Sequence, residues 1–125
     1  MGRYEEGENV YSKMLEKNKG VKAKCSRAYC RSKQGKYKEA EEEYNEVIGA
    51  IEDAEEKRYA VHNRGICRQR LGMHKEAVND YTTLISLDAT NAAAYFNRGM
   101  CYEALGNISA AINDYSAALE LENRI

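Results

Sequence analysis

The sequence predicts an all-α protein in which antiparallel helix pairs stack into a solenoid of about seven helices. Three observations support this prediction. The 125 residues include no proline, and 43% are hydrophobic and 31% are charged, a composition typical of a folded helical chain. Apolar residues recur at the spacing of an α-helix along the chain. Groups of residues also return after a fixed interval, which indicates a repeat protein.

The repeat is clearest in the second half of the chain, where one set of residues returns 34 positions later. The set is Asn63-Arg64-Gly65, Leu71-Gly72, Ala77 and Asp80-Tyr81, and it returns as Asn97-Arg98-Gly99, Leu105-Gly106, Ala111 and Asp114-Tyr115. So many matches in one register exclude coincidence. A period of this length predicts a structural unit that stacks on its neighbours.

Two earlier copies extend the repeat toward the N-terminus. Residues 35–44 precede residues 72–81 by 37 positions, so three extra residues are expected near 49–55, at a helix boundary. Residues 2–11 reproduce residues 35–44 at a spacing of 33, so the chain is expected to open within a repeat. We therefore divide the single domain, 1–125, into a lone second helix at 1–19 and three repeats at 21–53, 54–90 and 91–125.

Each unit is expected to contain two helices joined by a short turn. In the last unit, Tyr95, Gly99 and Tyr102 form one helical stripe. Gly106 marks the break before the second helix, because glycine leaves a helix most readily. Asp53 with Glu56 has the spacing of a capping pair. The predicted helices are 3–17, 21–33, 36–50, 54–70, 74–87, 92–104 and 108–121, and their short loops make each pair antiparallel.

The pattern Tyr95-x-x-Arg98-Gly99-x-x-Tyr102 followed by Ala111-x-x-x-Tyr115 resembles the tetratricopeptide repeat (TPR). The resemblance covers essentially the whole chain and implies a right-handed superhelix. It also implies that small residues let the two helices of a unit approach closely and that tyrosines fill the space between units. The small residues are Ala28, Gly65, Gly99, Ala40, Ala77 and Ala111, and the tyrosines are Tyr44, Tyr81 and Tyr115.

The chain departs from the TPR pattern in several places. It has no tryptophan, and no unit has the closing proline of the family, so the turns between units are expected to be more helical. The first unit carries Lys24 and Arg31 where aromatic residues are usual. We expect this unit to pack less tightly than the third, with the lysine and arginine stems along the apolar surface.

The residue types that carry chemistry do not form a recognisable catalytic or metal-binding pattern. Cys30, Cys67 and Cys101 occupy the same place in successive units and are expected to be small buried core residues. Cys25 lies roughly 140° around the helix from Cys30, so the two would not share a metal ion. The acidic run at 41–43 is expected to be a solvated helix face. The sequence has no motif of a serine hydrolase, a phosphate-binding loop or a zinc protease, so we expect no enzyme activity, cofactor or metal.

In the proteins that this chain resembles, the first helices of successive units line a concave groove that binds a peptide or a partner helix. The resemblance therefore implies a protein-binding scaffold or adaptor. The helix face opposite the small-residue stripe supplies the expected binding residues. They are Lys22, Ser26, Tyr29, Lys33, Tyr59, His62, Asn63, Ile66, Arg70, Phe96, Asn97 and Met100.

Three of these residues keep two interpretations each. Phe96 is the only phenylalanine, and it is either an apolar anchor in the groove or a residue packed under an adjoining helix. Asn63 and Asn97 either hold a peptide backbone, because an amide both donates and accepts hydrogen bonds, or are recurring structural residues.

The carboxylate clamp of co-chaperones is one use of such grooves, and this chain does not match it. At the five clamp positions the chain has Cys25, Tyr29, Asn63, Ala93 and Asn97, of which only Asn63 matches. Each missing cation removes a charge-assisted hydrogen bond of roughly 1.5–3 kcal/mol. Losing three weakens binding by about three orders of magnitude or more, so we do not expect a chaperone clamp.

The charge distribution suggests an alternative function. The net charge is −1, but nine basic residues and no acidic residue lie between positions 17 and 38. One interpretation is electrostatic binding of an acidic protein segment or, less readily, of nucleic acid. The other is a solvated helix rich in lysine, which we favour.

The remaining expectations concern location and the ends of the chain. No apolar run is long enough for a membrane span or a secretory signal, so we expect a cytoplasmic protein without a membrane partner. Ile108, Ile112 and Leu119 are expected to be only partly covered. We infer a segment of a longer repeat protein, with self-association through the uncapped terminal helices as the main alternative.

Overall fold

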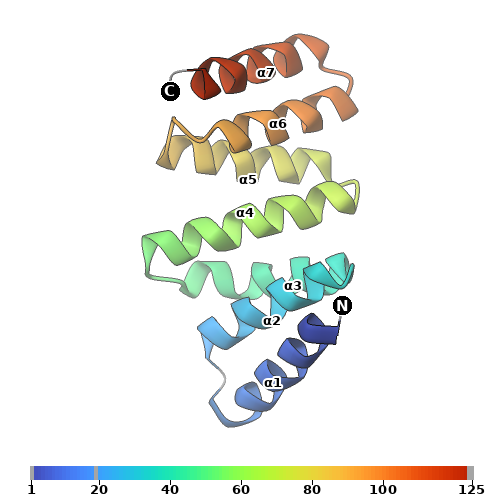
Figure 1. The fold of residues 1–125 in the computed structure, drawn as a ribbon, viewed down its shortest axis with the longest axis vertical. Helices are drawn as coiled ribbons and strands as arrows, with labels where there is room; N and C mark the ends of the chain where they lie inside the picture. Colours follow the sequence, from blue (N-terminus) through green and yellow to red (C-terminus); the bar gives the residue numbers. More distant parts are fainter. Residues whose placement is uncertain (1, 19, 124–125) are drawn as a thin grey trace.

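The computed structural model describes residues 2–18 and 20–123, and in this part of the chain it contains helices and no strand (Figure 1). The helices stack in chain order from α1 at one end to α7 at the other, and each packs mainly on the helices before and after it. The predicted all-α solenoid of antiparallel pairs is therefore confirmed. The elements are α1 (Gly2–Asn18), α2 (Val21–Lys33), α3 (Tyr37–Val47), the 3-10 turn η1 (Ile48–Ala50), α4 (Ala54–Arg70), α5 (His74–Leu87), α6 (Ala92–Ala104) and α7 (Ile108–Glu122).

The turn inside each repeat is made by a glycine in the left-handed region. Gly35, Gly72 and Gly106 have φ angles of 84°, 78° and 83°, which a residue with a Cβ adopts only with strain. In each turn the amide after the glycine donates to a carbonyl five residues back; for Asn107 and Tyr102 the N···O distance is 2.9 Å. These three turns reverse the chain within a repeat, as predicted for Gly106.

The extra residues between Tyr44 and Gly65 lengthen the start of α4 and not the connection that precedes it, because α4 begins 11 residues before Gly65 whereas α6 begins 7 residues before Gly99. The chain leaves α3 through η1, and Ile51 then enters the core with 6% exposure. The Asp53 side chain caps α4, because its Oδ1 accepts from the amides of Glu55 and Glu56 at 2.8 and 3.0 Å. The expected helical character of this connection is confined to η1, because the backbone is extended at Ile51 and Asp53, as it is at Asp88 between α5 and α6.

Small residues bring the two helices of a repeat together, as the TPR resemblance implied. A Cβ on Gly65 would lie 3.1 Å from Cζ of Tyr81, and one on Gly99 would lie 2.8 Å from Cε1 of Tyr115. Tyr81 is fully buried between repeats. Tyr115 is only partly buried, since α7 has no further helix stacked on it in the described chain.

The cysteines at the repeated position are core residues, as predicted. Cys30, Cys67 and Cys101 are 7%, 0% and 0% exposed, and all four cysteines of the chain are free thiols. Burial raises the pKa of Cys67 and of Cys101 to about 11, so both stay protonated at neutral pH. Within residues 2–18 and 20–123, no group of His, Cys, Asp and Glu side chains could hold a metal ion.

A ladder of buried ion pairs runs through the stack, and the sequence analysis did not predict it. Arg27, Arg64 and Arg98 each form bidentate bonds with an acid 16 residues later, on the second helix of the same repeat. Each also donates from Nη1 to a polar oxygen on the second helix of the preceding repeat. The acids are Glu43, Asp80 and Asp114, and the oxygens belong to Ser12, Asn45 and Thr82. We call this set the arginine ladder.

One expectation about charged residues was wrong. The run at 41–43 is not a solvated face, because Glu41 and Glu43 are 6% and 4% exposed and both bind arginine. The guanidinium of Arg31 is also held by acids: its Nε donates to Glu8 of α1 at 2.8 Å, and its Nη1 donates to Glu43 at 3.3 Å. These bonds tie α1, α2 and α3 together, so the polar residues of the first repeat hold it in place.

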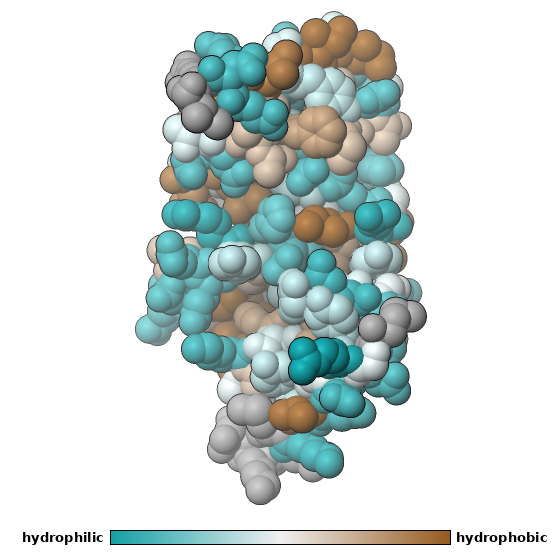
Figure 2. Space-filling view, in the orientation of Figure 1, coloured by the Kyte–Doolittle hydropathy of each residue, from teal (hydrophilic) through white to brown (hydrophobic). Residues whose placement is uncertain are grey.

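The outer face of α7 is open, as expected. Ile108, Ile112 and Leu119 are 52%, 57% and 60% exposed, and apolar surface is visible over α7 at the upper end of the molecule (Figure 2). The equivalent residues of α5, Val78 and Ile85, pack against the core that includes α6. No helix in the described part of the chain is long and apolar enough to cross a membrane.

Candidate functional site

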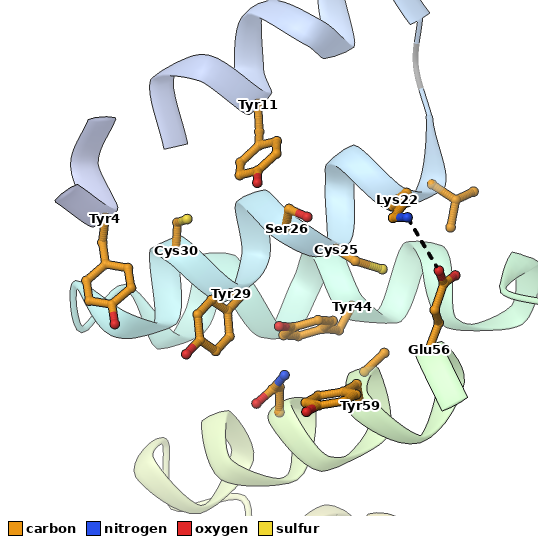
Figure 3. A pocket seen from close by; sticks show the side chains of 13 residues that line it. Tyr4, Tyr11, Lys22, Cys25, Ser26, Tyr29, Cys30, Tyr44, Glu56 and Tyr59 are labelled. Carbon is orange, nitrogen blue, oxygen red and sulfur yellow. Dashed lines mark ion pairs between the residues drawn. The ribbon is translucent and has the colours of Figure 1, made fainter. Parts of the chain in front are cut away.

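Two hollows lie along the first helices of the repeats, and α4 contributes to both. The larger, of about 510 Å³, lies where α1, α2, α3 and α4 meet (Figure 3). We call it the tyrosine pocket, because five tyrosines line it: Tyr4, Tyr11, Tyr29, Tyr44 and Tyr59. The second hollow, of about 460 Å³, lies between α4 and α6 beside the start of α5.

The tyrosines surround the pocket at different depths. Tyr44 forms its floor and is 1% exposed, whereas Tyr59 is 72% exposed at the rim. Tyr4 and Tyr29 meet edge to face with their ring centroids 6.2 Å apart, a favourable aromatic geometry. Tyr11 projects from α1 toward α2 from the side opposite Tyr59 (Figure 3). The pocket wall therefore carries five aromatic rings and comes from four helices.

Charge is scarce in the tyrosine pocket. Its two charged lining residues, Lys22 and Glu56, form a loose ion pair with Nζ and Oε1 3.9 Å apart. Both side chains are exposed, so the pair lies at the mouth of the pocket. Lys33 is nearby, with its Nζ 5.4 Å from the centroid of the Tyr29 ring. The inner wall consequently offers hydroxyls, thiols and rings without a net charge.

The second hollow is more polar. Gln69, Arg70 and Asn97 supply donors, and Ile66 and Met100 supply apolar surface. His74, the first residue of α5, also lines it, and its Nδ1 is buried with no hydrogen-bond partner among the described residues. This hollow can therefore accept an oxygen-bearing group beside an apolar one.

Nine of the predicted binding residues line the two hollows. Lys22, Ser26, Tyr29, Tyr59 and Asn63 line the tyrosine pocket, and Ile66, Arg70, Asn97 and Met100 line the second hollow. Lys33, His62 and Phe96 line neither. Tyr4, Tyr11 and Tyr44 were not among the predicted residues, because only the first helix of each unit was expected to line the groove. The recurrence of tyrosine from position 11 to position 44 was the available signal.

His62 and Phe96 occupy equivalent positions and pack on equivalent tyrosines. The His62 ring meets Tyr81 at 6.5 Å between centroids, and the Phe96 ring meets Tyr115 at 5.5 Å. Burial lowers the pKa of His62, which keeps its imidazole neutral. Phe96 combines features of both interpretations given above, since it packs on α7 and remains 49% exposed.

The arginines of the basic stretch are engaged within the protein. Arg27 and Arg31 bind Glu43 and Glu8, and Lys36 binds Glu8 with its Nζ at 2.8 Å from Oε1. The side chain of Lys17 and all of Lys19 lie outside the described structure. Because internal carboxylates already neutralise these cations, the stretch presents fewer free charges than its composition suggested.

Comparison with known proteins identifies the family. The tetratricopeptide repeat family matches residues 21–53, 59–91 and 92–123. The chain therefore belongs to the TPR family, as its sequence pattern and stacked helix pairs indicate. No protein of curated function matches it by sequence.

Solved structures share the fold. MamA 41-end from Desulfovibrio magneticus RS-1 has a TM-score of 0.86 at 18% identity over 97% of this chain and 67% of its own. PcrH in complex with the chaperone binding region of PopB has a TM-score of 0.73 at 18% identity over 83% and 82% of the two chains. The first TPR of Spaghetti (RPAP3) bound to the HSP90 peptide SRMEEVD has a TM-score of 0.72 at 28% identity over 84% and 81%.

Proposed function

We propose that this chain is a non-catalytic protein-interaction module that binds a partner peptide in a groove along α2, α4 and α6. The arrangement of the two hollows carries this proposal. Asn63 lines the first and Ile66 lines the second, and three residues of an α-helix rise only about 4.5 Å. One peptide lying along α4 would therefore contact both hollows. Two neighbours in fold, PcrH and the RPAP3 repeat, are bound to a partner segment in their structures.

The ligand proposed here differs from an acidic chaperone terminus. Cys25, Ala93 and Asn97 occupy clamp positions where cations are required, and α2 supplies no cation at the floor of the tyrosine pocket. Arg70, in the second hollow, is the cation best placed to meet a partner oxygen. We propose a mainly apolar ligand with few charges.

The chemistry of the hollows supports binding over catalysis. Burial raises the pKa of the Cys25 and Cys30 thiols and of the Tyr44 hydroxyl. These groups stay protonated, whereas a nucleophile or general base must be deprotonated to act.

The proposal is tested by selecting peptides from a displayed random library and measuring their affinity by calorimetry. Asn97→Ala and Met100→Ala should each weaken the selected peptides by roughly tenfold, the usual cost of removing an interface anchor. Lys75→Ala, an exposed α5 residue that lines neither hollow, should bind as the native chain does. Failure to select any peptide, or equal affinity in all three variants, would contradict the proposal.

A further inference from the structure

The hydroxyl of Tyr44 distinguishes the tyrosine pocket from the equivalent places in the other repeats. Tyr81 donates its hydroxyl to Oε1 of Gln69, and Tyr115 donates to Oε1 of Glu103 at 2.7 Å. Gln69 and Glu103 lie at the position of Ser32 in the first repeat, and the Ser32 hydroxyl donates to the carbonyl of Tyr29 instead. Tyr44 is thus the member of this series whose hydroxyl has no partner in the described structure.

The small-residue stripe also differs in the first repeat. Tyr81 and Tyr115 lie against Gly65 and Gly99, where an added Cβ would fall about 3 Å from the ring. The first repeat has Ala28 at this position, and Ala28 is fully buried in the same core cluster as Tyr44. Tyr44 also lines the tyrosine pocket.

The unpartnered hydroxyl of Tyr44 favours a ligand that can form a hydrogen bond with it. A buried tyrosine hydroxyl usually finds a hydrogen-bond partner, and leaving it without one is costly. Asn63 approaches the Tyr44 oxygen as a donor, which lowers the pKa of Tyr44 against the effect of burial, but the contact lacks the geometry of a full hydrogen bond and leaves the hydroxyl hydrogen without an acceptor. A ligand group that reaches the pocket floor and carries an oxygen would therefore complete the site.

The surroundings exclude charged groups as the preferred occupant. Among the described side chains, an anion would meet no cation at the floor and a cation would meet no carboxylate there, because Lys22 and Glu56 are paired at the mouth. Removing either ion from water without a counter-charge is expensive. Five tyrosine rings instead favour an uncharged aromatic ring, and the volume of about 510 Å³ is in the range of ligand pockets.

We propose that the tyrosine pocket binds a tyrosine side chain of the partner peptide, with the partner hydroxyl hydrogen-bonded to the hydroxyl of Tyr44. A tyrosine supplies an apolar ring for the wall and a tip that both donates and accepts. Phenylalanine offers no oxygen, and tryptophan only donates. This inference rests on the proposed function, since it assigns the anchor of the same groove.

The test uses side-chain analogues and the intact chain. We would titrate 15N-labelled protein with p-cresol, toluene and tetramethylammonium and follow the amide shifts by NMR. We expect p-cresol to shift amides around the tyrosine pocket and to bind about fivefold more tightly than toluene, the effect of one neutral hydrogen bond. The Tyr44→Phe variant should remove this preference. Tetramethylammonium, a probe for cation binding by aromatic rings, should bind more weakly than p-cresol.

Matched variants separate binding from folding. Tyr81→Phe and Tyr115→Phe remove hydroxyls that already have partners, so both should lower the melting temperature and keep the preference for p-cresol. Tyr44→Phe removes an unpartnered hydroxyl and should not lower the melting temperature. Equal affinity for p-cresol and toluene, an unchanged preference in Tyr44→Phe, or tighter binding of tetramethylammonium would overturn this inference. Library peptides that bind in the groove without a tyrosine would overturn it while leaving the proposed function intact.

Discussion

The first and third repeats share the arginine ladder but differ in what surrounds it. In the first repeat, Arg31 joins the ladder and bonds to Glu8 of α1, and Lys36 and Gln34 donate to the same carboxylate. In the third repeat, the position of Arg31 holds Tyr102. There the rings of Tyr95 and Tyr102 flank Arg98, with centroids 5.6 and 5.8 Å from its guanidinium carbon.

The second repeat resembles the first in using ion pairs between repeats. The same stacking geometry therefore accepts either ion pairs or apolar residues at these positions. Arg68 bonds to Glu41 of the preceding repeat at 3.0 Å and to Asp80 of its own at 3.2 Å. The positions equivalent to Arg68 and Glu41 one repeat later are Tyr102 and Val78. Ion pairs therefore couple the repeats at the N-terminal end, and apolar residues replace one pair at the C-terminal end.

The largest expected effect on stability comes from breaking the ion pair between Arg68 and Glu41. Arg68→Leu leaves the Glu41 carboxylate, whose side chain is 7% exposed, with Asn45 as its one remaining partner among the described residues. We expect a loss of about 3 kcal/mol in the free energy of unfolding, because an uncompensated buried charge is costly. Urea denaturation measures it.

Two further variants test whether the lost ion pair causes this effect. Tyr102→Leu removes no ion pair and should cost about 1 kcal/mol. The double variant Arg68→Tyr with Glu41→Val reproduces the third repeat in the second and should recover most of the lost stability, since apolar replacement of a buried pair is often neutral. A double variant as unstable as Arg68→Leu would show that the two chemistries are not interchangeable.

A smaller effect is expected from the close approach of helix and tyrosine. Gly99→Ala places a methyl group 2.8 Å from Tyr115 and 3.3 Å from the carbonyl oxygen of Ala111. Overpacking should outweigh the helix-propensity gain of alanine, with a net loss of about 1–2 kcal/mol. Thermal unfolding followed by circular dichroism measures this loss. Ala28→Gly, the reverse change in the first repeat, should also lose stability, but through lower helix propensity and a cavity. A gain of stability in Gly99→Ala would contradict the overpacking at Tyr115.

The smallest effect concerns the Glu8 carboxylate, which holds α1 to α2 and to the residues that follow it. Burial alone would raise the pKa of Glu8, but hydrogen bonds from Lys36, Arg31 and Gln34 outweigh it and lower the pKa to about 2. A carboxyl with a lowered folded-state pKa stabilises the protein above its unfolded value of 4.5, and this contribution is lost as pH falls toward 2. After allowance for solvent screening, we expect about 1 kcal/mol.

The contribution of Glu8 is tested by measuring the free energy of unfolding in urea at pH 6 and at pH 3. The native chain should lose about 1 kcal/mol more than Glu8→Gln over this interval. Hydrogen exchange in α1 should quicken in Glu8→Gln at pH 6, whereas exchange in α7 should not change. The same pH dependence in both proteins would place the acid sensitivity elsewhere.

The helix boundaries could be predicted from the sequence because local residues mark where each helix ends. Gly35, Gly72 and Gly106 end helices by a backbone conformation that glycine adopts freely, and the 34-residue period then places the other boundaries. The bounds of α2 and α4 agree with the prediction, and α3 ends three residues early because η1 tightens its last turn. The TPR pattern also predicted that Cys30, Cys67 and Cys101 are buried.

The arginine ladder and the floor of the tyrosine pocket depend on contacts between helices, which a pattern along one helix does not show. The separation of Arg64 from Asp80 returns for Arg98 and Asp114, and it would have indicated the ion pairs once the turn between the helices was placed. Tyr44 resembled the other repeated tyrosines in sequence. Its different role depends on a residue of another helix, because Ser32 stands where Gln69 and Glu103 accept from Tyr81 and Tyr115.

The groove along α4 is tested most directly by mapping where a selected peptide binds. We would titrate 15N-labelled protein with the tightest library peptide and record the amide shifts at saturation. If the peptide lies along α4, the largest shifts occur around Ser26, Asn63, Ile66, Asn97 and Met100, with little change along α7. Shifts concentrated instead around Ile112 and Leu119 on the open face of α7, with the hollows unaffected, would contradict it.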